Sequence, residues 1–184
     1  HTAFSEVKNF LDLRPSTIQA LAEEFLDIIA VEEPDNFAKV PPGTHLVLLA
    51  EFDGNDLEEL KLKAKNLIKR SSAFAYQFAE SSSELDWVWA VRKSATAYLS
   101  RLPGEKPTRW IEDAAVPVEK LPDFVRGSEN LLKKYRISAA LFGHAGQGLL
   151  HFSPRLNRMS PDFQKLIEDL GYEHALLSRK LNGV

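Results

Sequence analysis

Residues 45–56, His-Leu-Val-Leu-Leu-Ala-Glu-Phe-Asp-Gly-Asn-Asp, decide the fold class, because an apolar run of strand length ends there in an acidic turn. The run from His45 to Phe52 predicts a short buried strand, and residues 53–56 lead from it into a helical pattern. A doubly wound parallel sheet would require a glycine-rich phosphate loop directly after its first strand. The aspartates of this turn repel phosphate instead. We therefore favour an α+β fold, an antiparallel sheet covered by helices on one side, over the alternative α/β doubly wound fold.

Alternating helix and strand patterns continue on both sides of this run. Apolar spacing predicts five helices: Ser16 or Thr17 to Ile29, Asp56 to Ile68, Glu84 to Leu99, Leu121 to Tyr135, and Ser160-Pro161 to Leu181. Further strands are expected at Ala73–Ala79, Arg109–Val116, Ile137–Gly143 and Leu149–Ser153. The order α, βα, βα, βα, ββα indicates ferredoxin-like βα repeats within a single domain, residues 1–184.

Composition excludes several classes of protein. Hydrophobic residues make up 44% and charged residues 27%, as in globular domains. The net charge of −3 argues against the concentrated basic surface that a nucleic-acid partner requires. The chain has no cysteine, which excludes disulfides, thiolate metal sites and iron–sulfur clusters bound by this chain. No apolar run reaches the ~18–20 residues of a membrane span, and we expect a cytoplasmic protein.

The densest group of candidate functional residues is the segment 142–151, Phe-Gly-His-Ala-Gly-Gln-Gly-Leu-Leu-His. Its three glycines indicate a tight turn or a close backbone approach. If the turn is a hairpin bend, His144 and His151 fall side by side at the same end of the sheet. Two neutral imidazoles suit a divalent metal such as zinc, iron or manganese, although a stable site requires a third protein ligand. The spacing leaves open that both histidines only form local hydrogen bonds.

Arg92 is the second candidate, because it lies beside the apolar stripe of its predicted helix rather than opposite it. Thr96 falls further round the same side. A guanidinium at the edge of a buried face requires an anion, and its planar fork matches a carboxylate. The alternatives are a structural ion pair with an internal Asp or Glu and a side chain that extends to solvent. His174, near the apolar face of the last helix, is interpreted as structural.

Five short motifs together resemble the C-terminal substrate or cap domain of the FAD-linked oxidases. That family includes D-lactate dehydrogenases, the glycolate oxidase flavoprotein subunit and D-2-hydroxyglutarate dehydrogenase. The motifs are Glu24-Phe25-Leu26-Asp27, Glu51-Phe52-Asp53-Gly54, Trp89-Ala90-Val91-Arg92, Glu112-Asp113-Ala114-Ala115-Val116-Pro117, and Gly143-His144 through His151. Their order and spacing cover nearly the whole chain.

The resemblance implies a role for each candidate. Arg92, assisted by Thr96, would hold the carboxylate of a small 2-hydroxy acid, while His144 and His151 would ligate a divalent metal (Zn, Mn or Fe). The FAD that performs the redox chemistry would be bound by the protein's own FAD-binding domain, and electrons would pass to an iron–sulfur partner. Through such an electron-transfer partner the cytoplasmic protein could be peripheral to the inner membrane. The family's third metal ligand, a Glu, and the His that acts as base are expected beyond Val184. We therefore expect this chain alone to be inactive.

Two positions depart from the family pattern Gly-His-x-Gly-Asp-Gly-Asn-Leu-His. Gln147 replaces its Asp, and Leu149 replaces an Asn that reaches the substrate in the family. Because leucine cannot form a hydrogen bond, either the substrate differs or another residue supplies the contact. The alternative function is a non-catalytic ferredoxin-like module that binds a ligand or a protein, in which Arg92 pairs internally.

Overall fold

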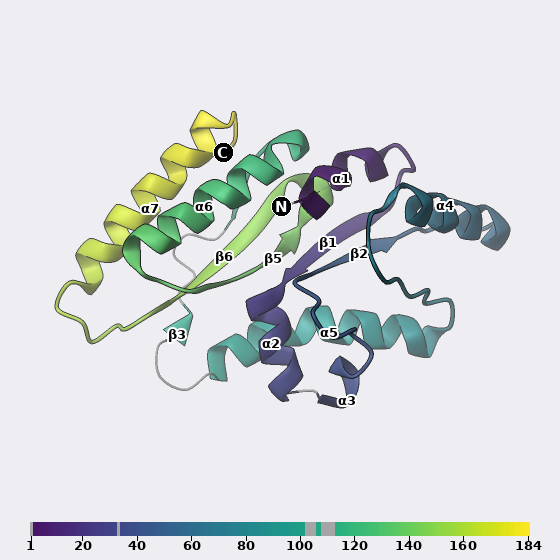
Figure 1. Cartoon of the computed structure of the whole chain (residues 1–184), viewed down its shortest axis with the longest axis horizontal. Coiled ribbons are helices and arrows are strands. Elements are labelled where there is room, and N and C mark those ends of the chain that lie inside the picture. The colour runs from purple at the N-terminus through teal and green to yellow at the C-terminus, as the bar shows by residue number, and fades with distance from the viewer. Residues whose placement is uncertain (1, 33, 102–105, 108–112) are drawn as a thin grey trace.

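The computed structural model of the chain describes residues 2–32, 34–101, 106–107 and 113–184 (Figure 1). Its helices are α1 (Thr2–Leu11), α2 (Glu23–Glu32), α3 (Pro34–Phe37), α4 (Leu57–Arg70), α5 (Ser82–Arg101), α6 (Leu121–Tyr135) and α7 (Phe163–Lys180), with 3₁₀ turns η1 (Val118–Lys120) and η2 (Ala145–Gln147). Its strands are β1 (Thr17–Ala22), β2 (Leu46–Glu51), β3 (Lys106–Pro107), β4 (Ala114–Ala115), β5 (Ala139–His144) and β6 (Leu149–Leu156).

The strands form one sheet in the order β2-β1-β5-β6-β3, and β4 also pairs with β6. Every pairing is antiparallel, including β1 with β5, which joins the two halves of the chain through Ala20 opposite Gly143. This arrangement confirms the α+β class and excludes the doubly wound alternative, whose strands would be parallel. The strand expected at 45–52 is present as β2.

Helices cover both faces of the sheet, which corrects the expectation of a one-sided layer (Figure 1). The α6-side core lies beneath α1, α6 and α7, and it consists of Phe4, Val7, Phe10, Ile18, Ala20, Ala114, Val116, Leu121, Phe124, Val125, Leu141, Ala145, Leu150, Phe152 and Leu170. The α5-side core lies beneath α2 and α5, and it consists of Leu21, Phe25, Leu26, Ile29, Leu99, Ala140 and Phe142. Side chains of β1 and β5 therefore alternate between two buried faces.

This double burial explains why the first predicted helix is wrong over its first six residues. Thr17–Ala22 forms β1, and the helix α2 begins only at Glu23. A strand that buries both faces has no alternation of apolar and polar residues, and Ile18, Leu21 and Phe25 happen to recur at helical spacing. The helix α1, which precedes β1, was not expected.

A second correction concerns Ala73–Ala79, where alternating aromatic residues predict a strand. The segment is irregular, and Phe74 and Tyr76 expose 72% and 65% of their surface. The last helix begins at Phe163 rather than at Pro161. Of the strand expected at 109–116, residues 109–112 lie outside the described residues, and β4 forms the remainder.

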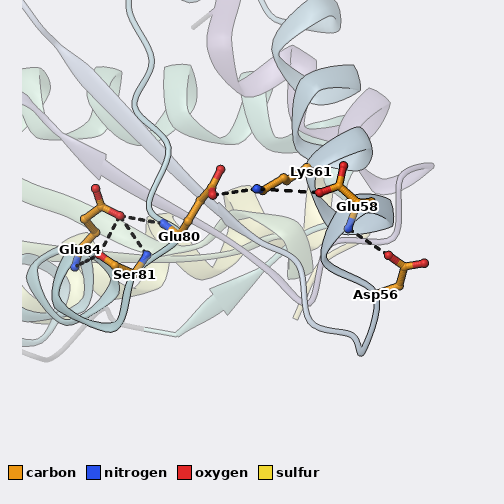
Figure 2. Close-up of polar contacts among 6 residues, drawn as sticks. All are labelled: Asp56, Glu58, Lys61, Glu80, Ser81 and Glu84. Carbon is orange, nitrogen blue, oxygen red and sulfur yellow. Dashed lines mark hydrogen bonds and ion pairs between the residues drawn. The ribbon is translucent and has the colours of Figure 1, made fainter.

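The start of α5 is fixed by polar contacts, shown in Figure 2. Ser81 and Glu84 form a capping box: the Glu84 carboxylate accepts from the Ser81 backbone N–H at 2.9 Å, and the Glu84 N–H donates to the Ser81 hydroxyl at 3.3 Å. These hydrogen bonds lower the pKa of Glu84 to about 2. Lys61 of α4 pairs with Glu80 at 3.1 Å. The cap and the ion pair position the helix that carries Arg92.

Among the described helices, none has the length and apolar character required to span a membrane.

His174 of α7 is buried in the α6-side core, as its structural interpretation requires. Its surface is only 4% exposed, and its ring lies 5.1 Å from the ring of Phe124 and 5.3 Å from that of Phe152. Nε2 has no hydrogen-bond partner among the described residues. Burial lowers the pKa of His174 to about 4.

This lowered pKa predicts an acid-sensitive fold. The folded state resists protonation of His174, whereas the unfolded chain takes up a proton below pH 6.5. The contribution of neutral His174 to the free energy of unfolding is therefore fully present above pH 6.5. It is lost as the pH falls toward 4, at up to about 1.4 kcal/mol per pH unit. His174→Leu, compared with the wild type by urea unfolding across this range, should flatten the pH dependence. Equal slopes in both proteins would contradict the assignment.

Candidate functional site

A group of polar side chains lies on the α5 side of the sheet, next to the apolar α5-side core. Gln19 of β1 follows Ile18 and precedes Ala20, both of which face the opposite core, so its side chain points toward α5. His144 shares this face with Phe142 of β5, and His151 enters it from β6. Arg92 reaches the same group from α5. Residues from β1, from α5 and from the β5–β6 hairpin thus converge.

Arg92 is held in this group by neutral partners. Its Nε donates a hydrogen bond to Oε1 of Gln19 at 3.0 Å, and its guanidinium carbon lies 5.1 Å from the centre of the Phe142 ring. Burial lowers the pKa of the Arg92 guanidinium from its ordinary value. Within the described part of the chain, no Asp or Glu forms an ion pair with it. The result is a partly buried cation without a described carboxylate partner.

The two histidines lie next to each other at the β5–β6 turn. Their ring centres are 5.7 Å apart and their planes meet at 80°. Nδ1 of His144 lies 2.7 Å from Nε2 of Gln19. The pKa of His144 is lowered, mainly by burial and next by the positive charge of Arg92, which keeps the imidazole neutral near pH 7.

His151 has an acidic partner, Asp113. Nδ1 of His151 lies 2.8 Å from Oδ1 of Asp113, whose side chain is 68% exposed. Asp113 has a φ of 71°, a left-handed conformation that aspartate tolerates better than most residues. A carboxylate that accepts a hydrogen bond from Nδ1–H of a histidine leaves the lone pair of Nε2 available for a metal. This arrangement is common around protein-bound metals.

The hairpin turn that brings the histidines together depends on two of its glycines. Gly143 has a φ of 149°, and a Cβ there would lie 2.7 Å from the Leu149 carbonyl oxygen. Gly148 has a φ of 72°, and a Cβ there would lie 1.8 Å from the Val116 carbonyl oxygen. Both positions therefore require glycine. The turn between them is the short helix η2, and His144 pairs with Leu149 across it.

The geometry provides two of the ligands that a metal site requires. The imidazoles of His144 and His151 are neighbours, and Asp113 orients His151. The described residues contain no group of three His, Cys, Asp or Glu side chains placed to hold a metal ion. A third ligand would therefore have to come from elsewhere.

The structure also contains site residues that the sequence reasoning missed. Gln19 was expected on a helix, so nothing in the sequence pointed to its contact with Arg92. Glu51, at the end of β2, accepts a hydrogen bond from the Trp89 indole at 3.2 Å, and both residues lie in motifs of the family resemblance. Thr96 lies on α5, but its side chain lies outside the described ones. Leu149 lies opposite His144 and is partly buried.

Comparison with known proteins agrees with the resemblance. The sequence pattern of the family "FAD linked oxidases, C-terminal domain" matches residues 2–184. The chain belongs to this family.

Its curated relatives carry several related names. The glycolate oxidase subunit GlcD of Bacillus subtilis is 36% identical over 132 residues, which cover 70% of this chain and 27% of that protein. A D-2-hydroxyglutarate dehydrogenase of Pseudomonas putida is 28% identical over 143 residues, 74% of this chain and 14% of that protein. A D-lactate dehydrogenase of Anaerostipes hadrus is 28% identical over 158 residues, 79% of this chain and 33% of that protein. The chain spans a third or less of each of these proteins.

Proposed function

We propose that this chain is the substrate-binding, or cap, part of an FAD-dependent oxidoreductase that oxidises a small D-2-hydroxy acid, of the lactate or glycolate type, to the 2-oxo acid. Family membership and the names of the relatives support the class of reaction. The observation that carries the proposal is Arg92, a partly buried cation with no ion-pair partner among the described carboxylates. A substrate carboxylate would supply the missing negative charge.

In this proposal Arg92 binds and orients the substrate. Its Nε donates to Gln19, so in this proposal the two terminal nitrogens would donate to the substrate carboxylate in the bidentate manner. Phe142 beneath the guanidinium shields one side from water. Thr96, one turn further along α5, would assist. Such a clamp positions C2 of the acid for the transfer of hydrogen.

The proposal assigns His144 and His151 to a divalent metal (Zn, Mn or Fe) that would polarise the substrate hydroxyl or carboxylate. Their adjacency and the Asp113 contact support this assignment. The third ligand and the base that takes the hydroxyl proton are assigned to other parts of the protein. The chemistry that FAD would supply, when held by the FAD-binding domain, is removal of the C2 hydrogen as a hydride, and an iron–sulfur partner would carry the two electrons onward. The 184-residue chain alone is therefore proposed to be inactive.

The arginine clamp predicts a specific kinetic defect. In the full-length protein, Arg92→Met should lower kcat/KM for its 2-hydroxy acid by roughly 100-fold, because a charged hydrogen-bonded pair with the substrate is lost. Arg92→Lys keeps the charge but loses the planar guanidinium that can donate two parallel hydrogen bonds. Its kcat/KM should therefore lie between those of the wild type and Arg92→Met. Arg126→Met, at an exposed arginine paired with Asp123 on α6, is the matched control and should be unaffected.

Steady-state kinetics and thermal unfolding of the same variants separate the proposal from its rival. A large loss of stability in Arg92→Met with unchanged turnover would assign Arg92 to structure and favour the non-catalytic binding module.

The metal assignment predicts a loss of bound metal. His151→Ala should reduce the metal content of the purified full-length protein, measured by elemental analysis, to less than half that of the wild type, because one of its protein ligands is removed. His45→Ala is the control, since His45 is exposed and pairs with Glu23 at 2.9 Å, away from the turn. Full metal content in His151→Ala would remove His151 from the ligand set.

A further inference from the structure

Gln19 is a buried amide whose hydrogen-bonding groups are all engaged. Only 2% of its surface is exposed. Its Oε1 accepts from Nε of Arg92, while its Nε2 donates to the Thr17 hydroxyl at 2.8 Å and lies 2.7 Å from Nδ1 of His144. One side chain thus connects the two groups to which the proposed function gives different roles, Arg92 and His144.

Arg92 fixes the orientation of this amide. The Arg92 Nε–H can only donate, so the atom that faces it must be the amide oxygen. Turning the amide over would place its NH₂ group against Nε–H, two donors facing each other within a buried site. The NH₂ group must therefore face His144.

This orientation in turn selects the tautomer of His144. A donor from Gln19 requires a lone pair on Nδ1, and a neutral imidazole with a free Nδ1 carries its proton on Nε2. His151 has the opposite arrangement, because Asp113 accepts from its Nδ1–H and leaves the lone pair on Nε2. Of the two neighbouring imidazoles, His151 is ready to bind a metal through Nε2 and His144 is not.

We propose that Gln19 is a positioning residue that sets the tautomer of His144 and links it to the orientation of Arg92. For a metal to bind His144 through Nε2, the proton must move to Nδ1 and the Gln19 amide must turn its oxygen toward it. That turn breaks the Arg92–Gln19 hydrogen bond, so Arg92 loses the partner that fixes its Nε. The orientation of Arg92 and the binding of a metal by His144 are therefore linked through one amide. This link rests on the proposed function, whereas the assignment of the His144 tautomer does not.

The tautomer is tested directly by nitrogen NMR. In metal-free, full-length protein labelled with ¹⁵N-histidine at about pH 8, where imidazoles are neutral, His144 should show a protonated Nε2 and an unprotonated Nδ1. Its signals are assigned by their loss in His144→Gln. Gln19→Glu should reverse the pattern, because its carboxylate can only accept from His144 while it still accepts from Arg92 and Thr17. Leu21→Met, a buried neighbour on the same face of β1, is the packing control and should leave the pattern unchanged.

A wild-type His144 protonated on Nδ1, or an unchanged pattern in Gln19→Glu, would overturn the proposal. Since the readout requires neither turnover nor metal, it decides the role of Gln19 even if the proposed oxidoreductase function fails.

The link to the metal is tested with zinc and an uncharged variant. Gln19→Met removes the amide at similar side-chain length, so zinc binding no longer has to break the hydrogen bond to Arg92. Zinc affinity measured by calorimetry should rise roughly 10- to 100-fold in Gln19→Met, the range for one hydrogen bond to a charged group, and should not change in Leu21→Met. Equal affinities in wild type and Gln19→Met would overturn the link while leaving the NMR result to decide the tautomer.

Discussion

The structure depends on the burial of β1 between β2 and β5, with a packed core on each of its faces. This strand pairs with β2 along its whole length and with β5 at Ala20 and Leu21, and it thereby ties the N-terminal elements to the β5–β6 hairpin. Ile18 and Ala20 pack toward α6, and Leu21 packs toward α5. Because one face must accept α5, the polar side chain of Gln19 is buried there and has to be satisfied by hydrogen bonds. Arg92 and His144 satisfy it, so the packing constraint also positions the candidate site.

The site that results combines a cation and two imidazoles that have different hydrogen-bond partners. Arg92 is partly buried against Phe142 and is bonded to a neutral amide. His144 is kept neutral by burial and by the charge of Arg92, whereas His151 is oriented by Asp113. In the proposed function these features would bind a small carboxylate beside a metal. Gln19, His144 and His151 lie on strands, and Arg92 lies on a capped helix. The glycine turn between β5 and β6 sets the spacing of the histidines.

The sequence predicts the later elements and the candidate site better than it predicts the start of the fold. The helices around Arg92 and at 121–135, and the hairpin of His144 and His151, carry clear periodicity or turn chemistry, and each was found. The residues of β1 predict a helix because a strand buried on both faces lacks period-2 patterning. The strand predicted at 73–79 is wrong for the opposite reason, because its exposed aromatic residues alternate with the period of two that is typical of a strand. Gln19 and the Asp113–His151 contact arise from tertiary pairing, which local spacing does not encode.

In the proposed function, the protein that contains this chain oxidises a small 2-hydroxy acid with FAD. The most direct test of this function is the visible absorption spectrum of the purified full-length protein, recorded without oxygen before and after addition of D-lactate, glycolate or D-2-hydroxyglutarate. The expected result is a flavin spectrum that bleaches with one of these acids. A flavin that none of them bleaches would point to a different substrate, in line with Leu149 in place of the family's Asn. A protein without flavin would contradict an FAD-dependent function and leave the non-catalytic binding module as the better description.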